Sequence, residues 1–194
     1  QKSQPVSSME VQVDDRGGMC TVRMKEMPLS VANGLRRACL SQVTVPAFEK
    51  LLVRVNTSDH PDELIAHRLG LFPLRGTGGD GVATLRLRCA GRQRVVRLSD
   101  FEWPENLAPV NPESPLVTLT QGQMLDLSVT ALWGSGSNHA KFCACSRAAL
   151  KHHAEPNGYT LELDSRHQHP ALVVAVMAAQ QMIESVQEMQ QVAA

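Results

Sequence analysis

The 194-residue chain has few aromatic residues, no excess of charge of either sign and no long hydrophobic run. Its 19 basic residues balance 19 acidic ones, so no overall field would attract a nucleic acid or a membrane surface, and only a local patch could do so. The longest apolar run, which begins at residue 170, turns polar after about ten residues and is too short to span a bilayer. The hydrophobic content of 43% is enough to form a core. We therefore expect a globular chain of one domain or two small ones.

The cysteines are odd in number and scattered, and the sequence starts without a basic-then-apolar signal segment. They are Cys20, Cys39, Cys89, Cys143 and Cys145. This usage favours reduced thiols in a cytosolic or nuclear compartment. Cys143 and Cys145 lack the spacing of a zinc knuckle, and no second pair lies at zinc-ribbon distance. Buried thiols are therefore favoured over a metal site.

Motifs that assemble an enzymatic nucleophile are also missing. The chain contains no G-x-S-x-G elbow and no H-E-x-x-H helix. Residues 76–81 match G-x-G-x-x-G, but a strand follows them where a phosphate cradle requires the start of a helix. We favour a turn there over a nucleotide site and assign no catalytic residue.

Apolar residues recur at helical spacing in three places. Ser30 can cap a first helix that reaches Gln42. The spacing of Val31, Leu35, Ala38 and Gln42 predicts one apolar stripe that ends in a polar residue. Pro61 starts a short second helix that Gly70 ends, and Pro73 makes Phe72 extended. Residues 170–192 form the third helix.

Between about residues 75 and 146 the sequence changes to glycine turns, proline clusters and short alternating strands. One of these strands presents an alternating apolar face made of Leu125, Leu127, Val129, Ala131 and Trp133. We predict an α+β fold. Residues 1–74 and 147–194 would form an α/β-type module with a mixed sheet and two main helices, split by a β-rich insertion at residues 75–146.

The segment DELIAHRLGLFPL, residues 62–74, embeds a histidine and an arginine in an apolar run. In one interpretation Glu63 and His67 pair on a solvated face, and the core residues are Leu64, Ile65 and Leu69. In the other, the charged residues anchor a partner, because arginine binds carboxylates and carbonyls at two points and is favoured at interfaces. The residues alone favour the first interpretation.

Arginines are concentrated between residues 75 and 97, where Asp80 is the one acid. They are Arg75, Arg86, Arg88, Arg92, Arg94 and Arg97. Alternating arginines on a hairpin usually make a solvated face. Contact with a single-stranded nucleic acid is the less favoured alternative, because this run lacks interleaved aromatic residues.

Four stretches resemble a known family in content and order: residues 29–43, 55–74, 119–142, and 159–165 followed by an apolar helix. The family is the alpha-like subunit shared by DNA-dependent RNA polymerases. Its members are the D polypeptide of the archaeal enzyme, the third-largest subunit of eukaryotic RNA polymerase II and the N-terminal domain of bacterial alpha. DELIAHRLGLFPL and HAKF are the most specific segments, and they point to the archaeal and eukaryotic branch or to a viral member.

The resemblance implies a non-catalytic assembly subunit without a cofactor. Its dimerisation module would pair with a smaller alpha-like subunit and dock the second-largest polymerase subunit, and it would meet DNA only through the complex. The residues that would lie at or support contacts with the large subunit are Asn33, Arg36, Arg37, His67, Arg68, Leu69, Gly70, His139 and Lys141. The dimer interface would use the stripe of the closing helix, which consists of Leu172, Val176, Ala179, Ile183 and Val186.

The chain also departs from this family. Many relatives carry a cysteine cluster in the insertion that holds zinc or an iron–sulfur centre, whereas Cys89 stands alone here, so we expect no metal. The implied location is the nucleus in a eukaryote, and the cytoplasm or virion for an archaeal or viral member. Two alternatives stay open. A free-standing homodimeric scaffold would use the same helix in a self-complementary contact, and a small α/β enzyme would show activity alone.

Overall fold

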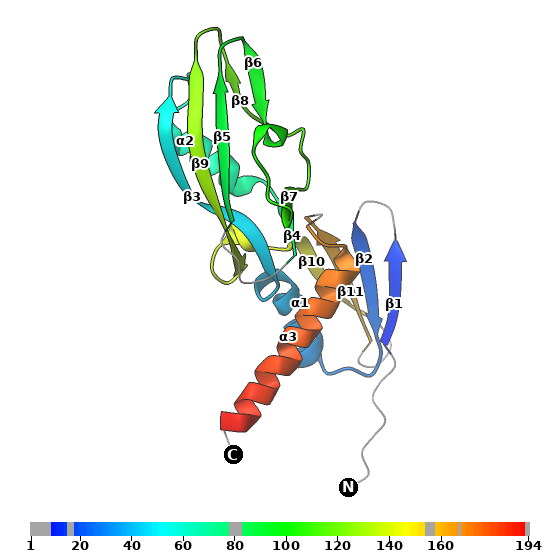
Figure 1. Cartoon of the computed structure of the whole chain (residues 1–194). Helices are drawn as coiled ribbons and strands as arrows, with labels where there is room; N and C mark the ends of the chain where they lie inside the picture. Colours follow the sequence, from blue (N-terminus) through cyan, green and yellow to red (C-terminus); the bar gives the residue numbers. More distant parts are fainter. Residues whose placement is uncertain (1–8, 15–17, 78–82, 154–157, 167, 193–194) are drawn as a thin grey trace. The chain divides into compact units, whose positions relative to one another are not determined.

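The protein is built from helices and antiparallel sheets, which confirms the predicted α+β class (Figure 1). This computed structural model describes residues 9–14, 18–77, 83–153, 158–166 and 168–192, so part of the glycine pattern at 76–81 lies outside the described residues. The chain divides into two compact units. Unit 1 comprises Gln1–Val43, Ser135–Ser137 and Cys143–Ala194, and unit 2 comprises Thr44–Gly134 and Asn138–Phe142.

The described residues of unit 1 form one sheet and two helices. Its elements are β1 (Met9–Asp14), β2 (Met19–Met24), α1 (Leu29–Ser41), β10 (Cys145–His152), β11 (Tyr159–Ser165) and α3 (Ala171–Val192). The strand order is β1-β2-β11-β10, and every neighbouring pair is antiparallel rather than mixed as predicted. Only a few residues separate β1 from β2 and β10 from β11, and such short connections allow a hairpin but no parallel crossover.

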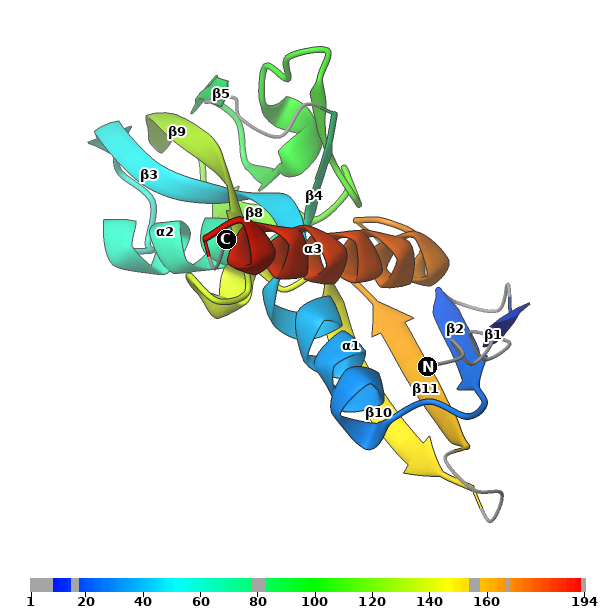
Figure 2. The ribbon, with the colours of Figure 1, turned by 90° about the horizontal axis from the view of Figure 1, so that it is seen from below.

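Both helices of unit 1 lie on the same side of its sheet (Figure 2). Val22 on β2 and Leu161 on β11 are cross-strand partners and are both buried beneath them. On α1 the buried residues are Ala32, Leu35, Ala38 and Cys39. The predicted stripe is therefore rotated, because Val31 and Gln42 are exposed. Small residues at the inward positions let the helix approach the sheet closely.

The first helix begins earlier than predicted. Pro28 occupies the capping position, and Ser30 is already the second helical residue. The Pro28 carbonyl accepts hydrogen bonds from the backbone N–H groups of Val31 and Ala32, at 3.0 and 3.1 Å. The helix therefore begins at Pro28 without a side-chain cap, and the fixed φ of proline (−60° here) is compatible with this position.

Unit 2, in the part that the structure describes, is a β-rich body with one α-helix. Its strands are β3 (Thr44–Asn56), β4 (Leu74–Gly76), β5 (Ala83–Ala90), β6 (Arg94–Arg97), β7 (Leu107–Pro109), β8 (Pro115–Leu119) and β9 (Met124–Ser135). Its helices are α2 (Asp62–Leu71) and the 3₁₀ turns η1 (Leu98–Asp100) and η2 (Ala140–Phe142). The main sheet has the order β3-β9-β5, and β4 with β7 and β6 with β8 form two smaller sheets.

One face of the main sheet of unit 2 carries the core. The predicted alternation of β9 is confirmed, because Leu125, Leu127, Val129 and Ala131 are buried and Trp133 packs against the same cluster. Ile65 and Leu69 of α2 belong to this cluster, as do Leu85 and Leu87 of β5. The helix thus covers one side of the sheet and leaves the other side bare.

The boundary of unit 2 differs from the predicted insertion, which started at residue 75. The unit begins at Thr44 instead, because Phe48 of β3 and the inward residues of α2 pack into the core of the β-rich body. Phe48 also lies against Phe101 and Trp103, with ring centroids 6.2 and 6.1 Å apart. Sequence periodicity identifies the apolar faces of β3 and α2, but it does not show which of the two cores they pack into.

The second helix ends close to the predicted residue, but by another route. It runs through Gly70 to Leu71, and Gly70 does not have the positive φ of a glycine cap. Phe72 is extended (φ −73°, ψ 124°), as predicted from Pro73. Proline therefore stops this helix, and Gly70 is an ordinary helical residue.

Candidate functional site

Helix α3 has an apolar face on each of two sides. The inward face is buried and consists of Ala171, Val174, Ala175 and Ala178. The predicted interface stripe lies on the other side: Leu172 and Ala179 are half-buried, and Val176, Ile183 and Val186 are 49%, 57% and 49% exposed. A stripe of this kind on a lone chain is a surface that another chain could cover. No described helix is long and apolar enough to cross a membrane.

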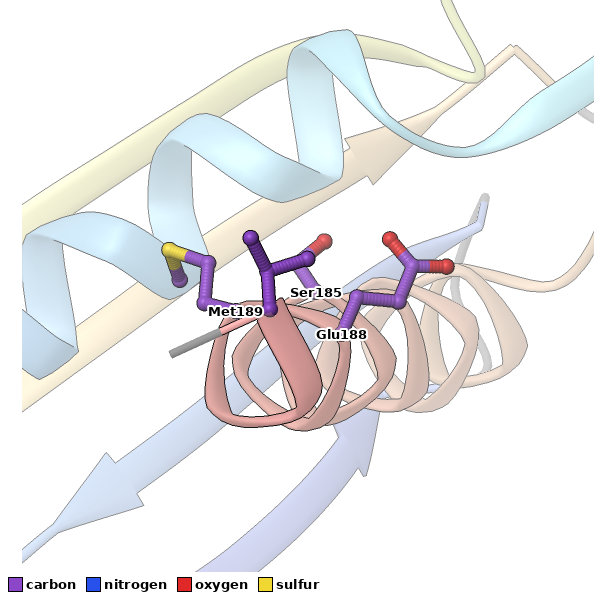
Figure 3. Close-up of a pocket in the computed structure, with 4 residues that line it drawn as sticks. Ser185, Glu188 and Met189 are labelled. Atoms are coloured by element: carbon purple, nitrogen blue, oxygen red, sulfur yellow. The ribbon is translucent and has the colours of Figure 1, made fainter. Parts of the chain in front are cut away.

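The C-terminal half of α3 extends beyond the residues that support it in unit 1. Met182 is the last inward residue with partial burial, and it packs against α1 at Gly34, where an added Cβ would lie 3.0 Å from the Met182 methyl group. Farther along, Ser185, Met189 and Val192 continue the inward spacing but are exposed. Together with Glu188 they line an open depression, and Figure 3 shows the labelled side chains on one side of the helix. The predicted stripe did not include Met189 and Val192, although extending the inward spacing would have found them.

The outer face of α1 carries the first group of predicted partner-binding residues. The Arg36 guanidinium donates to the Asn33 side-chain oxygen at 2.9 Å, so Asn33 orients this arginine. Arg37 is exposed, and no acid among the described residues forms an ion pair with it. The structure therefore presents one oriented and one unpaired guanidinium on this helix.

The outer face of α2 forms a ridge of three residues, Leu64, His67 and Leu71, which we call the α2 ridge. Leu64 and Leu71 are 40% and 53% exposed, and His67 is exposed between them. The spacing of three and four residues places all three on one side of the helix. Leu64 was expected in the core, whereas the structure places it outside, because the inward positions belong to Ile65 and Leu69.

Other predicted residues near α2 are engaged within unit 2. Arg68 donates to the Pro115 carbonyl of β8 at 3.0 Å, and Leu69 is fully buried. Gly70 is half-buried, with nothing within 4 Å of an added Cβ. Arg68 and Leu69 could therefore support a docking surface by fixing α2, whereas the α2 ridge would supply its contacts.

The HAKF segment at residues 139–142 is fixed mainly by its own unit. The Lys141 ammonium forms an ion pair with Glu49 of β3 and lies 5.1 Å from the centroid of the Phe142 ring. Its side chain is only 15% exposed. The backbone N–H of Lys141 donates to Nδ1 of His139 at 3.1 Å, which leaves the exposed imidazole as the outward group of this turn.

The cysteines are free and mostly buried. Cys20, Cys39, Cys89 and Cys145 are buried, and Cys143 is half-buried with its thiol 3.3 Å from the Leu40 carbonyl. Burial, followed by the neighbouring Cys145, raises the pKa of Cys39 to about 12. Burial, followed by the neighbouring Cys143, also raises the pKa of Cys145 to about 12. Within the described ranges no group of three or more His, Cys, Asp or Glu side chains could hold a metal ion.

Thiol alkylation of the native chain at pH 8 is expected to modify Cys143 first. The buried thiols stay protonated, and thiolate is the form that reacts. In the unfolded chain a thiol ionises near pH 8.5, whereas the pKa values of Cys39 and Cys145 are raised in the folded chain. The folded state therefore holds these protons longer, and the free energy of unfolding should fall as the pH rises from about 9 towards 12. Mass spectrometry after timed iodoacetamide treatment, with a urea-unfolded control, measures the order of modification. Equal rates at Cys39 and Cys143 would contradict the burial.

The chain is similar to subunits of RNA polymerases, although no family model matches it. It is 35% identical over 121 residues to DNA-directed RNA polymerase subunit Rpo3 of Methanocaldococcus jannaschii. The aligned region covers 61% of this chain and 62% of the relative. Rpo3 of Pyrococcus furiosus is 34% identical over 130 residues, with 61% and 49% covered. DNA-directed RNA polymerases I and III subunit RPAC1 of Bos taurus is 29% identical over 164 residues, with 63% and 47% covered. The chain thus spans less than two thirds of the length of these curated relatives.

Proposed function

This chain is a homologue of the alpha-like subunits of DNA-directed RNA polymerases, and from that premise we propose that it is a non-catalytic assembly subunit of such an enzyme. In this proposal it pairs with a smaller alpha-like subunit through α3 and docks the second-largest polymerase subunit through α1 and α2. DNA would be met only through the assembled enzyme. The observation that carries the proposal is that Val176, Ile183 and Val186 of the α3 stripe are apolar and about half exposed.

Burial energetics support pairing through α3. Three stripe residues, Val176, Ile183 and Val186, expose about half of their side chains, and covering an aliphatic side chain fully contributes about 1.5 to 3 kcal/mol. The overhanging end of the helix adds Met189 and Val192. A monomer would keep all of this surface in water, whereas a second helical subunit could cover the stripe in one contact, and Met189 and Val192 would be covered from the inward side.

Docking of the large subunit is supported by two surfaces of different chemistry. On α1, Asn33 and Arg36 are already bonded to each other, so little side-chain freedom would be lost when the guanidinium binds. On α2, the ridge offers an imidazole flanked by two leucines. Interfaces commonly combine such apolar anchors with arginine.

A homodimeric scaffold is the alternative, and it would use the same α3 stripe. The purified chain would then form one dimeric species in light scattering without any partner. The assembly proposal instead expects the lone chain to be poorly soluble and to become monodisperse when it is co-expressed with the smaller subunit.

Co-purification with the second-largest subunit of the same organism tests the docking proposal. In co-expressed complexes, Arg37→Ala, and separately the double change His67→Ala with Leu71→Asp, should each lower recovery of the large subunit at least about tenfold, because interface anchors cost about 2 kcal/mol when truncated. Their unfolding midpoints should stay close to that of the wild type. Val95→Asp, at a partly exposed position of β6, is the control and should leave recovery unchanged.

Arg68→Ala distinguishes support from contact. This change removes the bond to the Pro115 carbonyl and should lower the stability of unit 2 by about 1 kcal/mol. If Arg37→Ala and the α2 ridge variant both recover the large subunit at the wild-type level, the docking proposal is wrong. The pairing proposal would still be judged separately, by the α3 stripe.

A further inference from the structure

The main sheet of unit 2 has a bare face that is rich in cations. Alternation places it opposite the core. Its exposed residues are Lys50, Leu52 and Arg54 of β3 and Thr84, Arg86, Arg88 and Ala90 of β5, and between them lie the half-buried Met124, Asp126 and Thr130 and the buried Ser128 of β9. The core cluster, which includes α2, lies on the opposite side. We call these residues the open sheet face.

Acids on this face are too few to balance its cations. Asp126 lies directly across from Arg88 and accepts an ion pair from Arg54 at 3.3 Å. Glu102 forms a backbone bridge with Arg86 at the edge of the sheet and is exposed there. Within the part of the chain that the structure describes, no acid forms an ion pair with Lys50, Arg86 or Arg88.

Two other clusters of cations are neutralised locally. On the solvent face of the sheet of unit 1, Glu162 accepts ion pairs from both Arg147 and Lys151. At the end of β6, Arg94 pairs with Asp100 and Arg97 pairs with Glu113. Within the predicted arginine run, Arg94 and Arg97 of β6 thus have acidic partners, whereas Arg86 and Arg88 of β5 form no ion pair with a described acid.

An apolar residue lies within the cationic face. Leu52 is 60% exposed, and its neighbours on the same side of β3 are Lys50 and Arg54. Neighbours on one side of a strand are about 6.8 Å apart, and β3 and β5 flank β9 at about 4.8 Å each. Two rows of cations about 10 Å apart thus border a mainly polar middle row, and Leu52 lies in one of the two cationic rows.

We propose that the open sheet face binds an acidic protein segment whose carboxylates meet Arg86, Arg88 and Lys50 and whose apolar side chain covers Leu52. Arginine binds carboxylates at two points, and Leu52 gives an apolar contact between the cations. A nucleic acid fits less well. Its charge is continuous, so Asp126 and Glu102 would repel it, and the face has no aromatic residue on which bases could stack. This inference does not depend on the polymerase assignment.

Fluorescence anisotropy with the full chain tests the inference. The probe is a short labelled peptide of Asp and Glu around a central Leu, and the reference probes are the same peptide with Asn and Gln and a short oligothymidylate. The acidic peptide should bind the wild type, and binding should weaken as salt rises. Arg86→Gln with Arg88→Gln should lower the affinity for the acidic peptide at least about tenfold. This corresponds to a loss of roughly 0.7 kcal/mol of binding free energy for each of the two side chains.

A matched variant separates the face from net charge. Arg23→Gln with Arg92→Gln removes the same charge from exposed residues outside the face, and it should change the affinity less than about twofold. Leu52→Ala keeps every charge and should weaken the acidic peptide about threefold or more. Equal losses in both double variants, no binding of the acidic peptide, or tighter binding of oligothymidylate through the same arginines would each overturn the proposal.

Discussion

Replacing Gly136 by alanine is expected to destabilise unit 1 by at least about 3 kcal/mol. An added Cβ would lie 2.1 Å from the Leu40 carbonyl oxygen and 2.9 Å from the Cys143 thiol. The first of these atoms is backbone at the end of α1, so it cannot rotate away. A shift of the segment would also strain the 3.0 Å hydrogen bond from the Ser137 N–H to the Ser41 carbonyl. Gly136 has no positive φ, so lack of space is the cause.

The measurement uses urea unfolding followed by far-UV circular dichroism, together with labelling of Cys39 and Cys145. Both thiols are buried in unit 1, so their rate of labelling measures the opening of that unit. The fluorescence of Trp103 and Trp133 follows the unfolding of unit 2. Gly70→Ala is the matched control, because nothing lies within 4 Å of its added Cβ. It should be neutral or stabilising by up to about 1 kcal/mol, since alanine favours a helix. If Gly136→Ala unfolds at the same urea concentration as the wild type, the described contact with Leu40 is incorrect.

Replacing Val176 and Ile183 by glutamate is expected to abolish pairing with the smaller alpha-like subunit. Both side chains are about half exposed in the lone chain, so the double variant should fold with nearly unchanged stability. In the proposed interface each carboxylate would lose its water without gaining a partner, at about 2 kcal/mol or more each. A total of about 4 kcal/mol corresponds to a roughly thousandfold higher Kd.

Sedimentation velocity of the co-purified pair measures this effect. The control replaces Gln181, on another side of α3, and Gln121, in a turn of unit 2, by glutamate, which adds the same charge to exposed positions outside the stripe. That control should pair like the wild type. Wild-type affinity in the Val176 and Ile183 variant would show that the stripe serves another purpose, and equal loss in both variants would point to charge rather than contact.

The sequence alone predicted those parts of the fold that depend on local chemistry. The alternation of β9 is visible in its apolar residues, because a strand with one covered face must repeat every two residues. The prediction from Pro73 that Phe72 is extended is confirmed. The opening of α1 was misplaced because Ser30 is a good cap by type, although Pro28 can start the helix two residues earlier.

The sequence could not decide which apolar face of a helix is covered by its own chain. The first half of α3 is apolar on nearly all sides, so periodicity offers two stripes, and only packing against α1 and β11 selects the alanine-rich one as inward. Leu64 and Leu71 of the α2 ridge were missed for the same reason. Arg68 finds its acceptor at Pro115, which is 47 residues away, and no local pattern encodes such a contact.

The pairing of β2 with β11 sets an order for folding during synthesis. Met24 lies opposite Tyr159, so the sheet of unit 1 cannot close until most of the chain has left the ribosome. Unit 2 is almost one contiguous segment, Thr44–Gly134, and its contacts are available earlier. Because closing a long loop costs entropy before its contacts form, unit 2 should fold first. β2 and α1 would stay unpaired until β10, β11 and α3 have been synthesised. A nascent chain arrested before β11 would therefore expose the apolar inner faces of β2 and α1, and chaperones would be expected to bind there.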